Sequence, residues 1–161
     1  MKKGEVLFSL LRVAIGLIFL WAFLDKLFGL NFATPPDKSW LAGVSPTASF
    51  LAYASKGTFS GFFHVLSGSI VVDCLYMAGL VAIGLSMIFG IFQKIAGYSG
   101  ALMMALMYLS LFPSANNPLV DEHIIYLLLF LIFARGEAGL KFSLNKWWKR
   151  LSLTKKYSWL E

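Results

Sequence analysis

Four apolar segments decide what this chain can fold into, because each has the length needed to cross a lipid bilayer. Crossing the hydrocarbon core takes about 20 mostly apolar residues, with a range of about 17–25. The segments cover residues 6–24, 70–92, 95–112 and 118–134. In lipid, backbone polar groups have to be satisfied within the segment, which favours helices. We therefore predict an all-α membrane protein, a single bundle of four transmembrane helices formed by residues 1–161.

The composition supports a membrane protein and argues against a nucleic-acid-binding one. Of the 161 residues, 58% are hydrophobic and 14% are charged, whereas soluble domains carry about 25% charged residues. The net charge is +6, but seven of the fourteen lysines and arginines lie from Arg135 onward, after the last apolar segment. Such clustering is typical of membrane topology. The single cysteine, Cys74, excludes an intrachain disulfide, and we expect it to be a small buried apolar residue.

Basic residues also predict how the helices are oriented. Cytoplasmic loops of membrane proteins carry an excess of lysine and arginine. With the N-terminus in the cytoplasm, the outer side holds only Lys26, Lys38 and Lys56. We therefore expect a multi-pass protein of the cell (plasma) membrane with both termini cytoplasmic. The residues that this orientation puts inside are Lys2, Lys3, Lys94, Arg135, Lys141, Lys146, Lys149, Arg150, Lys155 and Lys156.

Small residues recur at every fourth position in the second and third segments. Such stripes allow helix backbones to approach closely in lipid. We therefore predict that the second and third helices pack against each other through these stripes, although chance in a chain rich in alanine and glycine is the alternative. The stripes are Ala78, Ala82, Ser86 and Gly90 in the second segment, and Gly97, Ala101 and Ala105 in the third.

Two further helices are predicted outside the spans. In the first loop, Ser45 before Pro46 is typical of a helix start, and an apolar run follows until Gly57. We expect this helix to lie on the outer face or to dip into the bundle.

The tail, residues 139–161, is predicted to form a cytoplasmic amphipathic helix that Ser143 caps. One side of this helix would be apolar and aromatic, facing the membrane interface, and the other side would be basic, facing anionic lipid. Docking of a soluble partner is the alternative. The apolar stripe is Leu144, Trp147, Trp148 and Leu151, and the basic side is Lys146, Lys149 and Arg150.

Arg12 lies about two turns inside the first apolar segment. Its guanidinium keeps its charge, so it needs a partner or a path to the interface. We expect a structural ion pair with Glu137, just past the fourth segment on the same side. Glu5 is another candidate partner, and extension of the side chain toward the headgroups is the alternative.

Ionisable residues from separate segments are expected at similar depth on the outer side. Ionisable groups at membrane depth are costly unless paired or hydrated, so this cluster is the candidate functional site. The dipole at a helix start also favours acids, which gives Glu122 in particular a purely structural explanation. The cluster comprises Asp25, Lys26, His64, Asp73, Asp121, Glu122 and His123, with Tyr126 one turn past His123.

A carboxylate, an imidazole and a phenol near the interface suit a quinone head group. Quinone carbonyls accept hydrogen bonds, and quinone reduction needs protons from groups that titrate near neutral pH. We expect Asp121 and His123 to be catalytic, exchanging protons, and Tyr126 to orient a carbonyl. The substrate-binding set is Asp25, Lys26, His64, Asp73 and Tyr126. We predict neither a metal nor a haem, although His64, His123 and Asp121 have the donor types of a facial metal triad.

Two stretches resemble the DoxX/DoxD family of membrane proteins. One runs from Leu11 to Trp21 and continues to Asp25-Lys26-Leu27-Phe28-Gly29, and the other runs from Asn117 to Tyr126. The resemblance implies a four-helix membrane fold. In the DoxD branch it implies the membrane subunit of a thiosulfate:quinone oxidoreductase of acidophilic archaea, which works with a second subunit and is linked to a terminal quinol oxidase. The residues at family-like positions are Arg12, Asp25, Lys26, Asn117, Pro118, Asp121, His123 and Tyr126.

Three functions remain open at the level of the sequence. The first is a quinone-interacting redox subunit associated with a respiratory complex, in which the enzyme activity would depend on other membrane subunits. The second is a non-catalytic scaffold or accessory subunit of a larger membrane complex, which the small-residue stripes and the tryptophan-rich tail favour. The third is a small transporter, against which the scarcity of polar residues in 78–107 argues.

Overall fold

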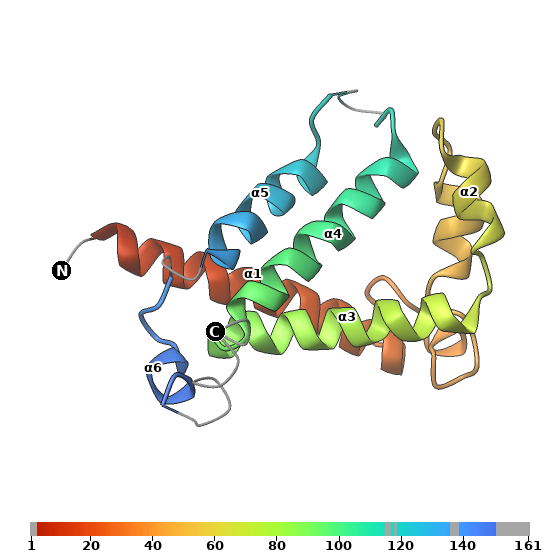
Figure 1. Cartoon of the computed structure of the whole chain (residues 1–161). Coiled ribbons are helices and arrows are strands. Elements are labelled where there is room, and N and C mark those ends of the chain that lie inside the picture. Colours follow the sequence, from red (N-terminus) through yellow and green to blue (C-terminus); the bar gives the residue numbers. More distant parts are fainter. Residues whose placement is uncertain (1–2, 115–116, 118, 136–138, 151–161) are drawn as a thin grey trace.

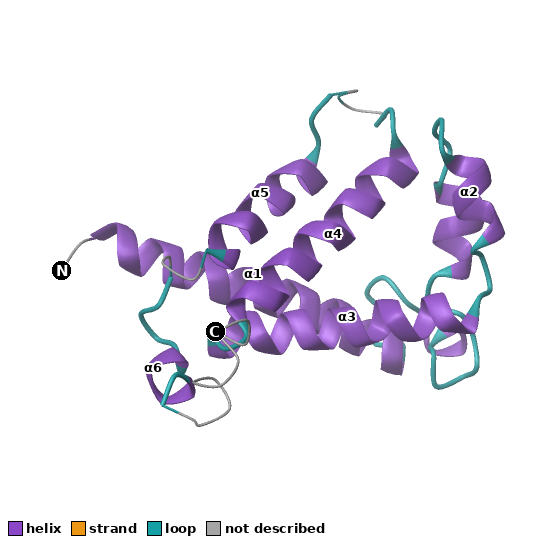
Figure 2. Cartoon of the chain, in the orientation of Figure 1, coloured by secondary structure: helices purple, strands orange, loops and turns teal. Residues whose placement is uncertain are grey.

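The chain folds as an array of helices, with no strand among the described residues (Figures 1 and 2). The computed structural model describes residues 3–114, 117, 119–135 and 139–150. Three of the helices within these ranges are long and apolar enough to cross a membrane. They are α1 (Lys3–Phe28), α3 (Ile70–Phe89) and α4 (Gln93–Leu111). The protein is therefore an all-helical, multi-pass membrane protein.

The fourth predicted span forms a shorter helix than expected, α5 (Glu122–Ala134), with 13 residues. At about 1.5 Å per residue it is about 20 Å long, against about 30 Å for the hydrocarbon core. The residues just before it turn instead of continuing the helix, because the Asn117 side chain accepts the backbone N–H groups of Leu119 and Val120, at 3.0 and 3.2 Å. A fourth complete crossing therefore stays a prediction.

The helices pair differently from the expectation based on the small-residue stripes. α1 packs most extensively on α3, and α4 on α5, whereas α3 and α4 contact each other much less. The glycines of α4 are used against α5: a Cβ at Gly97 would lie 2.6 Å from Ala134, and one at Gly100 would lie 2.6 Å from the Phe130 ring. The small residues of α4 therefore permit a close approach of α4 to α5, and not of α4 to α3 as predicted.

The core lies where the two helix pairs meet. Phe19 of α1 and Phe130 of α5 meet edge to face, with ring centroids 5.1 Å apart. Aromatic pairs prefer this geometry because the positive ring edge meets the negative ring face. The buried apolar residues around this contact are Ile15, Met77, Leu80, Ile83, Met87, Met104 and Phe133. Many large apolar side chains elsewhere on the long helices stay exposed, as expected for helices that face lipid.

The first loop contains three short helices: η1 (Pro36–Lys38), η2 (Phe50–Ala54) and α2 (Ser60–Val65). Ser45 does cap the start of the helical segment that leads into η2, because its Oγ accepts the Ala48 N–H at 3.0 Å. The helical turns end at Ala54, just before Gly57, and α2, which begins at Ser60, is a second short helix beyond the predicted one.

The first loop is fastened to the end of α4 next to Phe112. The Thr58 N–H donates to the Phe112 carbonyl at 2.9 Å, and Ser55 Oγ donates to the Ser110 carbonyl at 3.0 Å. Gly57 lies so close to the Phe112 carbonyl that a side chain there would overlap it.

The described part of the C-terminal tail contains only a four-residue helix, α6 (Asn145–Trp148). Ser143 does not cap this helix, because its Oγ donates backward to the Leu140 carbonyl at 2.6 Å. Trp148 lies against Phe92 at the start of α4, with ring centroids 4.3 Å apart. Leu151 and the rest of the predicted amphipathic stripe lie outside the described residues.

Candidate functional site

Asp121 and His123 form a directly bonded pair at the start of α5. Asp121 is the N-cap residue, and its side chain accepts the backbone N–H groups of His123 and Ile124 at 3.0 and 3.4 Å. Its second oxygen lies 3.0 Å from His123 Nδ1. The two side chains are only 4% and 12% exposed, respectively. One carboxylate therefore fixes both the helix start and the orientation of the imidazole.

The surroundings of this pair leave one ring nitrogen available. The imidazole of His123 bonds to Asp121 through Nδ1, and its Nε2 has no hydrogen-bond partner among the described residues. Tyr126, one turn along α5, is half-buried against the core. Glu122 is exposed. An imidazole held by a carboxylate on one nitrogen can accept or donate a proton at the other.

Asp121, Glu122 and His123 also offer three possible metal-ligand atoms within 4.8 Å of one another. They are consecutive residues at one helix start, where acids are favoured by the helix dipole. The Asp121 oxygens are already used by two backbone N–H groups and the imidazole. The geometry therefore gives no reason beyond proximity to assign a metal.

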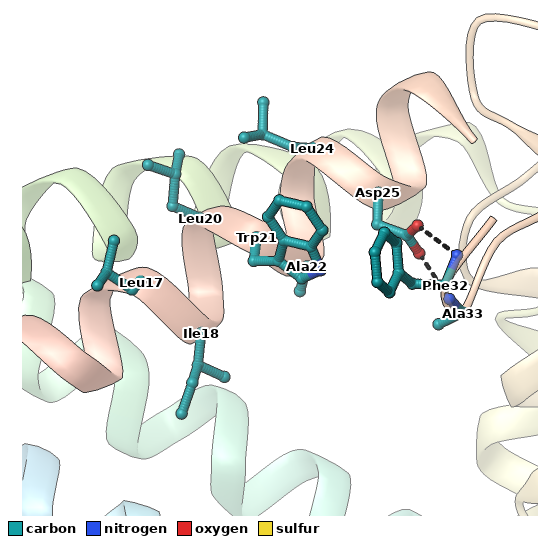
Figure 3. Close-up of a pocket in the computed structure, with 9 residues that line it drawn as sticks. All are labelled: Leu17, Ile18, Leu20, Trp21, Ala22, Leu24, Asp25, Phe32 and Ala33. Carbon is teal, nitrogen blue, oxygen red and sulfur yellow. Dashed lines mark hydrogen bonds between the residues drawn. The ribbon is translucent and has the colours of Figure 1, made fainter. Parts of the chain in front are cut away.

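Asp25 is buried, and its carboxylate accepts hydrogen bonds from the backbone of the loop that follows α1. Its two oxygens accept the backbone N–H groups of Phe32 and Ala33, at 3.2 and 3.1 Å (Figure 3). Lys26, at the next position, is half-buried, and its carbonyl accepts the Trp40 N–H at 2.9 Å. Both residues thus hold the beginning of the first loop against the end of α1.

Asp73 and His64 also have local partners. Asp73, buried in the first turn of α3, accepts hydrogen bonds from the hydroxyls of Ser45 at 2.8 Å and Thr47 at 2.5 Å. His64, in α2, lies with Nε2 2.9 Å from the Ser55 carbonyl. These contacts attach the first loop to α3 and fold the loop on itself.

The predicted outer cluster is therefore divided into separate groups. The Asp121–His123 pair is the one place where described members of the cluster bond to each other through their side chains. Asp25, Asp73 and His64 each bond to the first loop instead. In Figure 1 the start of α5 lies beside the end of α4, away from the end of α1 and the start of α3.

An apolar groove of about 750 Å³ runs along α1 and ends at the first loop. Trp21 and Phe32 form its wall at one end, meeting edge to face with centroids 5.1 Å apart. Asp25 is the one ionisable residue in the lining, and its oxygens already accept two N–H groups. The lining residues are Leu17, Ile18, Leu20, Trp21, Ala22, Leu24, Asp25, Phe32 and Ala33 (Figure 3).

The sequence does not indicate the groove, because its residues have the pattern of ordinary lipid-facing side chains. Trp21, near the end of the span, was the one available signal, since tryptophan favours the membrane interface. The position of Phe32 in the groove could not be predicted from the sequence, because it depends on how the first loop folds back onto Asp25.

Arg12 is fully buried and binds backbone carbonyls. Its Nη1 donates to the carbonyls of Met87 and Ile88 near the end of α3. Its Nε donates to Gly139 at 2.9 Å, and its Nη2 donates to Phe142 at 3.1 Å. The guanidinium therefore satisfies carbonyls that the end of α3 leaves without helical partners.

The expected partners of Arg12 have other positions. Glu137, the predicted partner, lies outside the described residues. The carboxylate of Glu5, which is exposed, lies instead 4.0 Å from the amino group of the half-buried Lys141. The guanidinium is buried and enclosed by four backbone carbonyls, so the Arg12 side chain does not extend toward the headgroups.

No protein-family model, curated protein or solved structure matches the chain.

Proposed function

We propose that the protein is a quinone-interacting redox subunit of a respiratory membrane complex, similar to the DoxD membrane subunit of thiosulfate:quinone oxidoreductase. The observation that carries this proposal is the contact between Asp121 and His123, 3.0 Å from oxygen to ring nitrogen, at the start of an apolar helix. A buried imidazole–carboxylate pair beside lipid is suited to a substrate that dissolves in lipid and exchanges protons.

The proposed chemistry divides electrons and protons between subunits. Reducing a quinone to a quinol takes two electrons and two protons, and oxidation of the quinol releases them. In this proposal the electrons come from a partner oxidoreductase subunit that oxidises a sulfur compound, or pass to a terminal oxidase. His123 Nε2 exchanges one proton with the nearer quinone oxygen, and water at the membrane surface exchanges the second proton with the other oxygen. Asp121 stabilises the imidazolium form of His123. The Tyr126 hydroxyl orients the second carbonyl.

The head group is assigned to α5 and not to the α1 groove. A quinone head group needs hydrogen-bond donors for its carbonyls. The groove lining has one side-chain donor, the Trp21 indole N–H, which does not titrate. Its one ionisable side chain, Asp25, has no proton to give when ionised, and its oxygens already accept two backbone N–H groups. At the start of α5, by contrast, His123 has a ring nitrogen free of partners among the described residues.

The proposal includes an orientation. With both termini in the cytoplasm, the start of α5 faces the outer side of the plasma membrane, and Arg12 and the C-terminal segment lie on the inner side. The excess of basic residues at the inner end supports this orientation, since the outer side carries Lys26, Lys38 and Lys56 alone.

Thermal unfolding of the purified protein with a short-chain quinone, decylubiquinone, tests the proposal. The quinone is expected to raise the Tm of the parent protein, because a ligand that binds only the folded state stabilises it. His123→Gln should abolish this rise. Asp121→Asn should reduce it while keeping the helix cap, since asparagine caps as well as aspartate. The matched control is His64→Gln, an imidazole bound elsewhere, to the Ser55 carbonyl.

Two results would overturn the quinone proposal. One is the absence of any Tm shift with benzoquinone and naphthoquinone analogues. The other is an equal shift in the parent protein and in His123→Gln.

A second candidate function is a non-catalytic scaffold or accessory subunit of a larger membrane complex. The observation that favours it is that each buried aspartate has a structural role: Asp25 and Asp73 hold the first loop, and Asp121 caps α5. Purification from membranes in mild detergent, followed by an assay of quinone turnover by the purified complex, discriminates between the two functions, because both kinds of subunit copurify with a complex. For a scaffold, His123→Gln leaves both the association and the quinone turnover intact, whereas for a redox subunit it lowers the turnover. A protein that always elutes alone contradicts this candidate.

A further inference from the structure

The C-terminal segment of residues 139–150 is bonded firmly to one end of the helix bundle. Arg12 donates to two of its carbonyls, those of Gly139 and Phe142. The Leu144 N–H donates to the Phe89 carbonyl at 2.8 Å, at the end of α3. Trp148 packs against Phe92 with the two rings tilted relative to each other. The segment is thus attached to α1, to α3 and to the start of α4.

The end of α3 is shaped to admit this segment. Gly90 ends α3 in the left-handed conformation with φ of 68°, which glycine adopts at little cost. A Cβ at Gly90 would lie 2.5 Å from the Ser143 Cβ and 2.9 Å from Arg12 Nη1. The docking of residues 139–150 is therefore part of the fold.

The outward surface of this docked C-terminal segment combines apolar and basic side chains. Phe142 is 70% exposed and Trp147 is 57% exposed. Lys146 and Arg150 are exposed and lie four residues apart, so they share one side of the helical turns. The segment has no carboxylate of its own and four cations, of which Lys141 lies 4.0 Å from Glu5 of α1. The cations are Lys141, Lys146, Lys149 and Arg150.

The fold also places this surface at the level of lipid headgroups. α1 begins, α3 ends, α4 begins and α5 ends at the same end of the bundle (Figure 1). Because α1, α3 and α4 have the length of membrane spans, that end lies at a membrane surface. Exposed tryptophan and lysine favour this region, since their apolar parts contact acyl chains and their polar parts contact headgroups.

We propose that the docked C-terminal segment binds the headgroup of an anionic phospholipid in the adjacent leaflet. Lys146 and Arg150 supply the positive charge that complements a lipid phosphate, and Trp147 and Phe142 supply the apolar contact to its chains. The attachment through Arg12 holds these groups in place before the lipid binds, which lowers the ordering cost of binding. The site is distinct from the start of α5, and it does not depend on the proposed quinone function.

The test is thermal unfolding of the full-length protein in detergent, with added phosphatidylglycerol or phosphatidylcholine. At a tenfold excess over its dissociation constant, phosphatidylglycerol should raise the Tm by about 3–6 °C, and phosphatidylcholine by much less. Lys146→Gln/Arg150→Gln should remove most of the rise. The matched control, Lys38→Gln/Lys56→Gln, removes two exposed charges from the first loop and should keep it. Salt at 0.5 M should weaken the effect, because it screens the charges.

A second measurement counts bound lipid directly by native mass spectrometry. Phosphatidylglycerol should remain on the parent protein and on Lys38→Gln/Lys56→Gln, but not on Lys146→Gln/Arg150→Gln. Equal Tm shifts with the two lipids would overturn the proposal, and so would a full shift in Lys146→Gln/Arg150→Gln. A Tm shift of the same size with inorganic phosphate alone would show that the site binds a free anion, and it would also contradict the proposal.

Discussion

Gly16 of α1 and Gly84 of α3 lie against each other at the crossing of these two helices. A Cβ at Gly16 would come within 2.8 Å of the Gly84 carbonyl oxygen, and a Cβ at Gly84 within 2.8 Å of the Leu20 backbone nitrogen. Each glycine thus permits the backbone of the other helix to approach. In lipid, such close backbone packing is a main source of helix association.

We expect Gly16→Ala and Gly84→Ala each to lower the free energy of unfolding by about 1–3 kcal/mol, because the extra methyl group forces the helices apart. The measurement is denaturant or thermal unfolding in detergent. Gly4→Ala is the control, because nothing lies within 4 Å of its Cβ position and alanine favours the helix. If Gly16→Ala is as stable as Gly4→Ala, the close crossing of α1 and α3 is wrong.

Replacing Arg12 should loosen the C-terminal segment as well as destabilise the protein. Arg12→Gln leaves buried carbonyls unpaired and should cost about 3 kcal/mol or more. Arg12→Lys keeps the charge but loses the forked donor geometry, so an intermediate loss is expected. Limited proteolysis measures the loosening as faster cleavage within residues 139–150. Lys38→Gln, which removes an exposed cation of the first loop and leaves residues 139–150 unchanged, should cleave at the parental rate, and an equal rate for Arg12→Gln would refute the attachment.

Asp121 combines two roles that substitutions can separate. Asp121→Ala removes the helix cap and should cost about 1 kcal/mol in the free energy of unfolding. Asp121→Asn keeps the backbone hydrogen bonds and should cost little, while it removes the carboxylate that faces His123. Chemical denaturation of both variants beside the parent protein gives the two costs. Equal losses for alanine and asparagine would show that capping is not what Asp121 contributes to stability.

Gln93 is a buried polar side chain whose removal should stabilise the protein. Its side-chain nitrogen and oxygen are both buried, and neither has a hydrogen-bond partner in the part of the chain that the structure describes. Replacing an unsatisfied buried amide with an apolar side chain of similar shape removes a desolvation cost of about 1–3 kcal/mol. We expect Gln93→Met to raise the Tm in detergent and Gln93→Glu, which buries a charge, to lower it. A fall in Tm for Gln93→Met would mean that the amide makes contacts that the apolar side chain loses.

The helices could be predicted from the sequence, but their pairing could not. Long apolar runs specify α1, α3 and α4 because a segment in lipid has to satisfy its own backbone hydrogen bonds, which a helix does. Of the two small-residue stripes, the one on α4 does mark a close contact, at Gly97, but with α5. Ala78 and Ala82 of the α3 stripe are exposed, and the glycine that α3 uses for close packing, Gly84, lies outside that stripe. Periodicity along one helix does not say which helix faces it, so the partners of Gly84 and Gly97, which are Gly16 and Ala134, emerged only from the fold.

The candidate site was predicted in part, for a related reason. Asp121 and His123 are two residues apart at a helix start, so their contact is local and readable from the sequence. The sequence predicts that Arg12 pairs with a carboxylate, whereas its described partners are backbone carbonyls. Every residue has a backbone carbonyl, so no sequence pattern identifies these partners. Asp73 binds hydroxyls 26 and 28 residues away in the chain, a distance that depends on the folding of the first loop.

The bonds of Arg12 also impose an order on biosynthesis. Chains are made from the N-terminus, so α1 reaches the bilayer with its guanidinium long before the acceptors exist. The Met87 carbonyl follows 75 residues later, and the Gly139 and Phe142 carbonyls follow 127 and 130 residues later. The nascent first helix therefore carries an uncompensated charge until α3 packs beside it. A chain whose synthesis stops before Gly139 would lack two of the carbonyls that bind the Arg12 guanidinium.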